Sequence, residues 1–284
     1  MVGAGKLSGF GLLRHPVVKG PARFLLANYR RCSLRVRRVV NQWGRQRQCY
    51  ICGKSFRKFA KYEKGSKGIS PFQKALDMVG SDVDNFGCLY CESHDRERHL
   101  FMYFDGLGLW EKVGGGRVLH FAPERWLATR IASLDPVEYV RADLHPRSDE
   151  VVAIDATALP HEDDHFDLVI ANHVLEHIPN YGRALSEFHR VLKPRGVAIL
   201  QTPYSRLLHN NFEDPNIDTE ELRAFFHGKW DHVRTFSERE LFGAIEAAGF
   251  CLQIIKHGDL FGPDQTFRYG VNPLEDLIRA VKPG

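Results

Sequence analysis

Residues Asp155–Pro203 read DATALPHEDDHFDLVIANHVLEHIPNYGRALSEFHRVLKPRGVAILQTP, and this stretch decides the expected architecture. Within it, Phe166–Ala171 is a short apolar run, which suits a strand covered on both faces better than a helix. Asn180–Leu192 follows with apolar residues at helical spacing, and Val197–Leu200 is a second apolar run. A strand, a helix and a strand in this order form a βαβ unit, whose strands are parallel. The sequence therefore predicts an α/β protein with a mainly parallel sheet.

Several segments of this stretch resemble the central part of class I S-adenosylmethionine-dependent methyltransferases of the type 11 group. They are Asp155-Ala156, Leu159-Pro160, Phe166-Asp167, His173–His177 and Arg190–Gly196. The resemblance is dense over residues 117–203 and weaker over 204–284. It implies a Rossmann-like fold with a seven-stranded, mostly parallel sheet, and S-adenosylmethionine as the cofactor. We accordingly expect a methyltransferase domain over residues 101–284, with an antiparallel edge made by Cys251–Lys256 and Asp276–Val281.

Length and composition are those of a globular protein with one domain and a smaller module. The 284 residues contain no apolar run of 18, so the sequence predicts no membrane-spanning helix. The N-terminus lacks the apolar core and cleavage site of a secretory signal, so a cytoplasmic location is expected. Charge is unevenly distributed: residues 1–62 hold 15 Lys or Arg and no Asp or Glu, and the rest has a net charge of −11.

The basic leader, residues 1–48, contains an apolar stripe at helical spacing that most of its arginines avoid. The stripe consists of Leu25, Tyr29, Cys32, Val36, Val39 and Trp43. This pattern predicts a basic amphipathic helix that begins near Pro21. Such a helix could dock on the protein's own body, contact an anionic membrane surface or bind RNA phosphates. An organelle-targeting peptide is the fourth reading, and the sequence leaves the four open.

Two CxxC pairs follow the leader and predict a zinc-ribbon-like module over residues 49–100. Two-residue spacing lets both thiolates of a pair reach one metal, and two pairs complete a tetrahedral structural zinc site. Because no secretory signal is present, metal binding is favoured over disulfides. The 35 residues between the pairs are expected to form a hairpin with a loop around Gly65–Ser70. The expected ligands are Cys49, Cys52, Cys88 and Cys91.

The segment after the second pair places Arg96, Arg98 and His99 next to Asp95 and Glu97. Charges of both signs at such spacing are typical of the solvated face of a helix. We therefore expect these side chains to point to solvent.

The first strand of the domain is predicted at Arg117–Ala122, and the turn after it reads His120-Phe121-Ala122-Pro123-Glu124. In the family this turn is glycine-rich, and the resemblance implies that it holds the methionine end of the cofactor. Here it has no glycine, and a side chain disfavours positive φ. The methionine end is then expected to be held differently, with Glu124 accepting a hydrogen bond from the α-amino group.

The next two strands are predicted to end in acidic residues. Val137–Arg141 is followed by Asp143, which can accept bonds from both ribose hydroxyls. Val151–Ile154 ends at Asp155, and the resemblance implies that Asp155 and the amide of Ala156 read adenine. The full set expected at the cofactor is His120, Phe121, Ala122, Glu124, Asp143, Asp155, Ala156, Asn172 and His173, of which the last two end the fourth strand beside the reacting sulfonium.

His173 and His177 are four residues apart at the start of a short helix, so they are expected on one face. The pair could bind a metal if a third ligand joined it, and the alternative for His177 is a structural hydrogen bond to backbone. Transfer to a hydroxyl is helped by a general base. The insertion after strand five offers His232 as base with Glu213 or Asp214 as its partner, beside His173.

The sequence thus predicts an S-adenosylmethionine-dependent methyltransferase with a structural zinc ion. A hydroxyl of a sugar, a glycan or another small molecule is the first expected acceptor, from the resemblance to bacterial relatives. RNA is the second, supported by the cysteine module and the basic leader and opposed by the acidic catalytic half. The third alternative is an inactive methyltransferase-like scaffold or binding module, which the glycine-less turn favours and Asp143 and Asp155 oppose.

Overall fold

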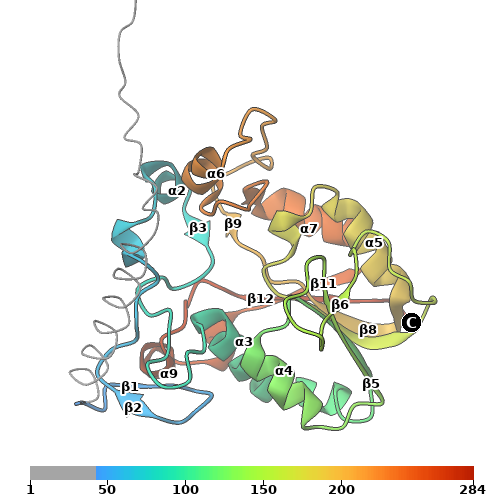
Figure 1. The fold of residues 1–284 in the computed structure, drawn as a ribbon, viewed down its shortest axis with the longest axis horizontal. Helices are drawn as coiled ribbons and strands as arrows, with labels where there is room; N and C mark the ends of the chain where they lie inside the picture. Colours follow the sequence, from blue (N-terminus) through green and yellow to red (C-terminus); the bar gives the residue numbers. More distant parts are fainter. Residues whose placement is uncertain (1–42) are drawn as a thin grey trace, which may run out of the picture. The chain divides into compact units, whose positions relative to one another are not determined.

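The computed structural model describes residues 43–284, so the predicted basic helix lies outside the described residues apart from Trp43. Gly44–Gly284 form one compact unit (Figure 1). No helix in this described part is both long and apolar enough to cross a membrane.

A seven-stranded sheet forms the centre of the unit. Its strands run in the order β11-β12-β8-β7-β4-β5-β6, and β12 is antiparallel to both of its neighbours while the pairs from β8 to β6 are parallel. The bounds are β4 Arg117–Phe121, β5 Glu138–Asp143, β6 Val152–Ala153, β7 Phe166–Ala171, β8 Leu192–Ile199, β11 Cys251–Ile255 and β12 Leu277–Val281. The predicted Rossmann-like fold with an antiparallel edge is confirmed.

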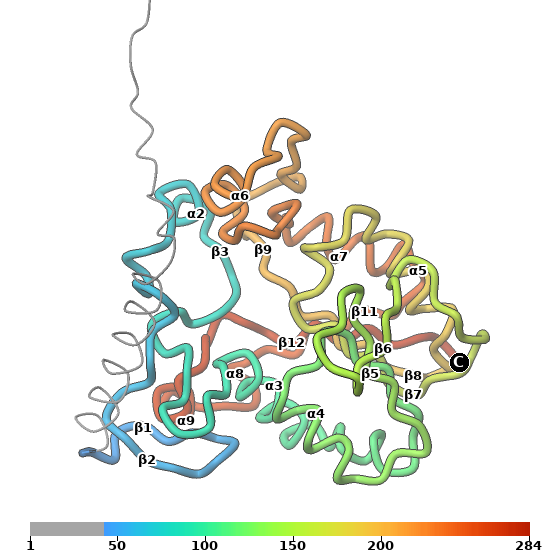
Figure 2. Tube along the Cα trace, viewed as in Figure 1, coloured from blue at the N-terminus to red at the C-terminus, as the bar shows by residue number. Residues whose placement is uncertain are grey.

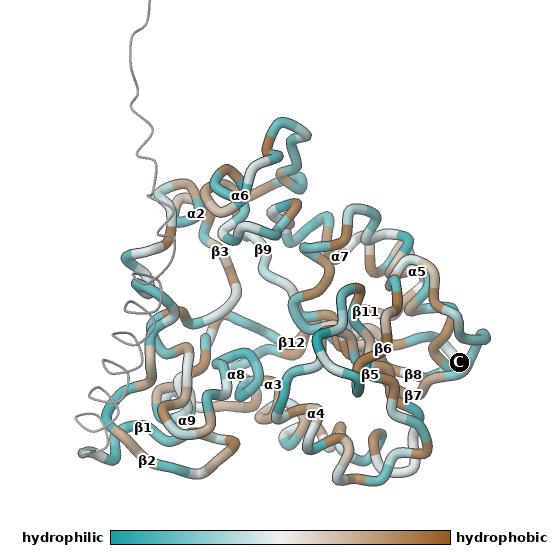
Figure 3. The backbone as a smooth tube through the Cα atoms, in the orientation of Figure 1, coloured by the Kyte–Doolittle hydropathy of each residue, from teal (hydrophilic) through white to brown (hydrophobic). Residues whose placement is uncertain are grey.

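Helices cover both faces of this sheet, because its central strands are apolar on both sides. Val118 and Leu168 belong to one hydrophobic cluster, and the residues that follow them, Leu119 and Val169, belong to the other. Helices α3 (Asp95–Gly106) and α4 (Arg125–Ala132) pack on the first face, and α5 (Tyr181–Val191) and α7 (Glu238–Ala247) pack on the second (Figure 1). The central strands are correspondingly hydrophobic in Figure 3.

The two helices on the second face each begin with a side-chain cap. The Asn180 side chain accepts from the amide of Arg183 at the start of α5, and Ser237 accepts from Glu240 at the start of α7. The remaining helices are α2 Pro71–Ala75, α6 Glu220–His227, α8 His257–Leu260 and α9 Pro263–Tyr269, with 3₁₀ turns at Gly65–Lys67, Leu109–Lys112 and Leu175–His177.

The segment between the cysteine pairs does not form the predicted hairpin. The one hairpin of this region, β1 (Arg47–Gln48) with β2 (Ser55–Phe56), lies around the first pair. The long segment instead folds into α2 and β3 (Met78–Val79), and β3 pairs with β9 (Tyr204–Ser205), which also pairs with β10 (Phe236–Ser237). The prediction is wrong because only the ends of the segment pair with each other, at the Ala60–Gly87 bridge, while β3 between them pairs with the insertion after β8.

Helix α2 packs against α6, which comes from the insertion after β8 (Figure 2). The Ser70 hydroxyl donates to the carbonyl of Phe225 at 2.6 Å, and the Phe72 ring meets the Phe226 ring edge-on with centroids 5.1 Å apart. Residues far apart in the sequence therefore form one wall above the carboxyl end of β8.

The predicted solvated face of α3 is buried. Arg98 is fully buried, and His99, Asp95 and Glu97 are each less than 5% exposed. The Arg98 guanidinium donates to the backbone carbonyls of Asn85, Phe86, Ser93, Tyr269 and Gly270. Alternating charges do not indicate a solvent-exposed helix face here, because these side chains are buried against partners in distant loops. The predicted domain boundary at residue 100 accordingly falls inside α3, within a single packed unit.

Candidate functional site

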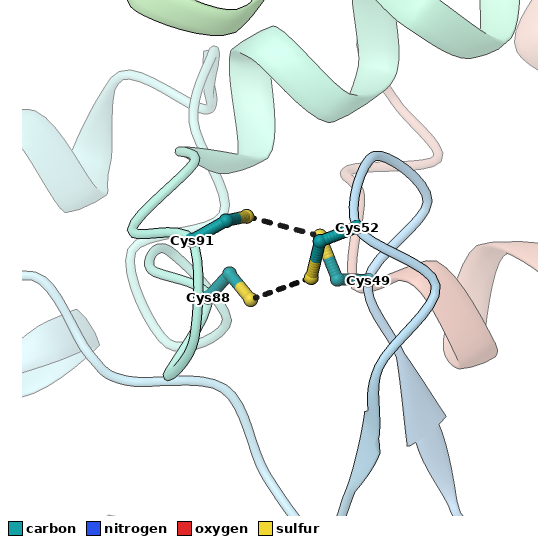
Figure 4. Close-up of side chains that lie close together, drawn as sticks. All are labelled: Cys49, Cys52, Cys88 and Cys91. Carbon is teal, nitrogen blue, oxygen red and sulfur yellow. Dashed lines mark hydrogen bonds between the residues drawn. The ribbon is translucent and has the colours of Figure 1, made fainter.

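The four predicted cysteine ligands come together (Figure 4). Their Sγ atoms all lie within 4.8 Å of one another; Cys49 Sγ is 3.6 Å from Cys91 Sγ, and Cys52 Sγ is 3.8 Å from Cys88 Sγ. A tetrahedral zinc with Zn–S bonds of about 2.3 Å places its sulfurs about 3.8 Å apart. The donor set and its spacing therefore fit zinc.

The two pairs sit on similar turns. In the first, the amide of Cys49 donates to the carbonyl of Lys54, and in the second the amide of Cys88 donates to that of Ser93. The Ser93 hydroxyl lies 3.4 Å from Cys49 Sγ and 3.2 Å from Cys91 Sγ, where it can donate to a thiolate. Thiolate charge at this site is thus supported by a neighbouring donor.

The carboxyl ends of β4, β5 and β7 lie level with one another. Phe121 is paired with Ala142 on one side and Ala171 on the other, and Asp143 at the end of β5 is paired with Ala153 of β6. Most of the residues predicted to bind the cofactor therefore lie along one edge of the sheet, including Ala122, Asp143, Asp155, Ala156 and Asn172. Ligands of open α/β sheets bind in the crevice at this edge.

The glycine-less turn adopts the left-handed backbone that its residues disfavour. Ala122 has φ +45°, where a non-glycine residue costs roughly 1–2 kcal/mol. The turn holds this conformation without a glycine because it is fixed from both sides. The Ala122 amide donates to the carbonyl of Ala142 at 2.8 Å, and Phe121 before it is buried in the core.

His120 does not reach the sheet edge but is fully buried and fixes Glu124. Its Nδ1 lies 2.9 Å from Tyr139 Oη and its Nε2 lies 2.9 Å from Glu124 Oε2, while the Asn172 amide donates to Glu124 Oε1 at 2.5 Å. Burial alone would raise the pKa of Glu124, but the hydrogen bond and charge of His120 hold that pKa below its usual value. A carboxylate is therefore presented beside the turn.

Asp143 and Asp155 each use one oxygen to order the following loop. Asp143 Oδ1 accepts from the amide of His145 at 2.7 Å. Asp155 Oδ1 accepts from the amide and the hydroxyl of Thr157 at 2.8 and 2.7 Å. The local bonds orient both carboxylates at the sheet edge.

A cavity of about 650 Å³ opens beside the ends of β7 and β8. Its walls come from the segment between the cysteine pairs, from the start of α3 and from the insertion after β8. Representative lining residues are Tyr62, Met78, Arg96, His173, Pro203 and His232. The Nε of Arg96 is buried without a hydrogen-bond partner in the described part of the chain.

His173 lies between two buried carboxylates at the inner end of this cavity. Its Nδ1 is 3.3 Å from Glu176 Oε1 and its Nε2 is 3.4 Å from Glu275 Oε1. Burial and then the charge of Arg96 would lower the pKa of His173, but the two carboxylates raise it above its usual value. His173 has φ +55° and directs its amide to the carbonyl of Gln201 at 2.6 Å.

His232 faces Glu176 rather than either predicted partner. Its Nε2 lies 3.8 Å from Glu176 Oε1, and burial is the main cause that lowers the pKa of His232 to about 4. Glu213 instead pairs with Arg234 at 2.7 Å, and Asp214 caps its own turn by accepting from the amide of Asn216. The pairing predicted for His232 is therefore corrected to Glu176.

The His177 ring meets the His232 ring edge-on, with ring centroids 4.8 Å apart. The short helix expected there is a 3₁₀ turn, Leu175–His177, and both His173 and His177 lie near the Glu176 carboxylate. The alternative, a hydrogen bond to backbone, is found: His177 Nδ1 lies 3.1 Å from the carbonyl of Asp231.

Glu176 and Glu275 are the site residues that the sequence did not single out. Glu176 is fully buried and accepts from the Thr202 hydroxyl at 2.7 Å. Its position between two histidines in the chain was a usable signal. Glu275 reaches the site from just before β12, and nothing local distinguishes it.

Residues 112–200 match the family described as "Methyltransferase domain". A sterol 4-C-methyltransferase of Caenorhabditis elegans is 36% identical over 67 residues, which are 24% of this chain and 19% of the relative. The chain thus matches about a fifth of the length of that curated relative.

Similar solved structures include a methyltransferase of Mesorhizobium loti dependent on S-adenosylmethionine, with 15% identity and a TM-score of 0.47 over 64% of this chain and 98% of that one. The YcgJ protein of Bacillus subtilis is 20% identical, with a TM-score of 0.43 over 63% of this chain and 99% of that one. The family match covers residues 112–200, and the strand order described above is that of a Rossmann-like methyltransferase fold.

Proposed function

We propose that the protein is an S-adenosylmethionine-dependent methyltransferase acting on a hydroxyl of a small polar acceptor. The observation that supports it best is the row of polar residues at the carboxyl edge of the sheet: the left-handed turn at Ala122, then Asp143, Asp155 and Asn172. Acidic residues at such strand ends bind ribose hydroxyls in related folds. The family match over residues 112–200 supports the same cofactor.

In this proposal Glu124 accepts from the α-amino group of the cofactor, Asp143 from the ribose and Asp155 from adenine. S-adenosylmethionine supplies an activated methyl group and a neutral thioether leaving group. The acceptor oxygen bonds to the methyl carbon as the carbon–sulfur bond breaks, and the hydroxyl proton passes to His232 as general base. The protein's contribution is alignment of the two reactants and exclusion of water.

The cavity supports a small acceptor. Its volume of about 650 Å³ lies within the range of sites for small molecules, and it adjoins the ends of β7 and β8. A sugar or a terminal glycan residue fits this description, whereas RNA would have to extend beyond it. Methyl transfer from labelled cofactor to sugars, glycans and RNA, with salt-dependent retention of RNA as a second assay, separates these acceptors.

We also propose that Cys49, Cys52, Cys88 and Cys91 bind one structural zinc ion. Their spacing supports it, and four protein ligands leave no open position for chemistry. Such an ion would fix the two turns on which the walls of the cavity depend.

Calorimetric titration of the zinc-loaded protein with S-adenosylhomocysteine tests the cofactor site. The wild type should bind, and Asp143→Ala should weaken binding by at least about tenfold, because a charged hydrogen bond contributes about 1.5–3 kcal/mol. Asp264→Ala on the exposed surface of α9 is the matched control and should bind as the wild type does. Absence of binding by the wild type would instead favour an inactive methyltransferase-like module.

A further inference from the structure

Glu176, His177 and His232 form a second group of metal-ligating side chains, separate from the cysteines. One ligand atom of each lies within 4.8 Å of the others. Glu176 and His232 are buried, and His232 lines the cavity. Two imidazoles and one carboxylate are a ligand set that divalent transition metals use when part of the coordination sphere stays open.

The hydrogen bonds of the two histidines determine which ring nitrogen is available. His177 Nδ1 lies 3.1 Å from the carbonyl of Asp231, and His232 Nδ1 lies 2.9 Å from the carbonyl of His227. A carbonyl oxygen only accepts, so each Nδ1 holds the hydrogen and each Nε2 keeps its lone pair. Histidine ligands of metals characteristically donate their other N–H to a backbone carbonyl or a carboxylate in this way.

Glu176 is held in the same manner. Its Oε2 accepts from the Thr202 hydroxyl at 2.7 Å, which orients the carboxylate. Its Oε1 is buried without a hydrogen-bond partner within residues 43–284, although a buried carboxylate oxygen normally has one. That unpartnered oxygen is the one that faces His232 Nε2 at 3.8 Å.

This separation suits a bridging cation better than a direct hydrogen bond. Donor atoms on a tetrahedral ion with bonds of about 2.1 Å lie about 3.4 Å apart, whereas a hydrogen bond requires about 2.9 Å. His173 Nδ1 competes for the same Glu176 Oε1 at 3.3 Å, but His173 also faces Glu275 and can neutralise only one of the two carboxylates. Asp231, which lies beside His177, has another buried oxygen, Oδ1, that finds no hydrogen-bond partner among residues 43–284.

We propose that Glu176, His177 and His232 bind a divalent transition-metal ion at the inner end of the cavity. Three protein ligands leave a position open toward the cavity, where the oxygen of the acceptor can bind. A hydroxyl bound there loses its proton more readily, and that proton passes to solvent. This inference rests on the proposed methyl transfer to a hydroxyl and makes His232 a metal ligand rather than the proton acceptor.

Cobalt binding to the zinc-loaded protein tests the proposal without any methyl donor. After Co²⁺ is added and excess is removed, we expect about one retained cobalt per chain, with visible absorption that lacks thiolate charge transfer. Thiolates prefer the zinc already bound, so a thiolate band would mean exchange at the cysteines and would count against the site. His232→Ala and Glu176→Gln should each weaken cobalt binding by at least about tenfold.

Two control measurements show whether a loss of cobalt reports on the proposed ligands. His209→Ala replaces an exposed histidine and should retain cobalt as the wild type does. Glu176→Gln preserves the shape of the side chain and an oxygen for Thr202, so it tests the charge even if the alanine variant folds poorly. No retained cobalt in the wild type, or equal retention in Glu176→Gln, would overturn the proposal. Titration with S-adenosylhomocysteine reports separately on the cofactor site, so failure of the metal site and failure of the proposed function are distinguishable.

Discussion

Arg98 should be among the most costly side chains to replace, although it does not line the cavity. Its guanidinium donates to five backbone carbonyls from three segments and lies 4.0 Å from the centre of the Phe59 ring. Two of these bonds, to Ser93 and Gly270, are fully buried. Each buried carbonyl left without a donor costs about 1–3 kcal/mol, and a bond from a charged donor contributes about 1.5–3 kcal/mol. Arg98→Met should therefore lower the free energy of unfolding by about 3–6 kcal/mol.

Urea denaturation of the zinc-loaded protein, followed by circular dichroism, measures this loss. Methionine keeps most of the aliphatic stem, so the result reports the missing hydrogen bonds rather than an empty space. Arg239→Ala replaces an exposed arginine on α7 and should change stability by less than about 0.5 kcal/mol. A loss below about 1 kcal/mol for Arg98→Met would refute the reasoning, because it would mean that these carbonyls are satisfied without the guanidinium.

Three further outcomes are expected. Ala122→Gly relieves the left-handed strain but adds chain entropy to the unfolded state, so the free energy of unfolding should change by less than about 0.5 kcal/mol. The control Ala128→Gly, in helix α4, should lower the free energy of unfolding by about 1 kcal/mol or more. Equal losses in the two variants would contradict this reasoning. Burial, and then the charge of Glu124, raises the pKa of Glu97 to about 7 from 4.5. The folded state then binds the proton more tightly, so the free energy of unfolding should fall by roughly 1–3 kcal/mol as pH rises from about 4.5 to about 7, and denaturation of Glu97→Gln across that range should show a flatter slope. Cys88→Ser should reduce the bound zinc from about one equivalent per chain to below about half, as measured by elemental analysis, and should lower Tm by on the order of 10 °C. An unchanged zinc content would exclude Cys88 as a ligand.

The parallel sheet was predictable because strands buried on both faces leave continuous apolar runs. The run at Phe166–Ala171 is β7 at the same residues. At the sheet's edge the signal weakens: Val152 and Ala153 are both exposed, and β6 is only two residues long. The positions of Asp143 and Asp155 followed from the same logic, since polar residues directly after parallel strands meet at one edge.

The cavity and its buried charges were not predictable, because they depend on contacts between distant segments. Nothing near α2 indicates that it will pack on α6, more than 140 residues later in the chain. Arg98 and Glu275 look like ordinary surface charges in the sequence, and only tertiary partners make their burial tolerable. The same applies to Ala122, whose strained backbone is held by the strands around it.

The order in which the chain is synthesised gives the Arg98 contacts a further consequence. Ribosomes add about 5–20 residues per second, so residue 270 follows residue 98 by about 10–30 s. Both cysteine pairs emerge before any strand of the large sheet, and zinc can bind to them at that stage. The carbonyls of Tyr269 and Gly270 and the aromatic surface of α6 do not yet exist, so Phe72 and the guanidinium remain without their final partners. The cavity therefore closes late in biogenesis, and nascent chains that stall before residue 220 should expose a hydrophobic surface for chaperones to bind.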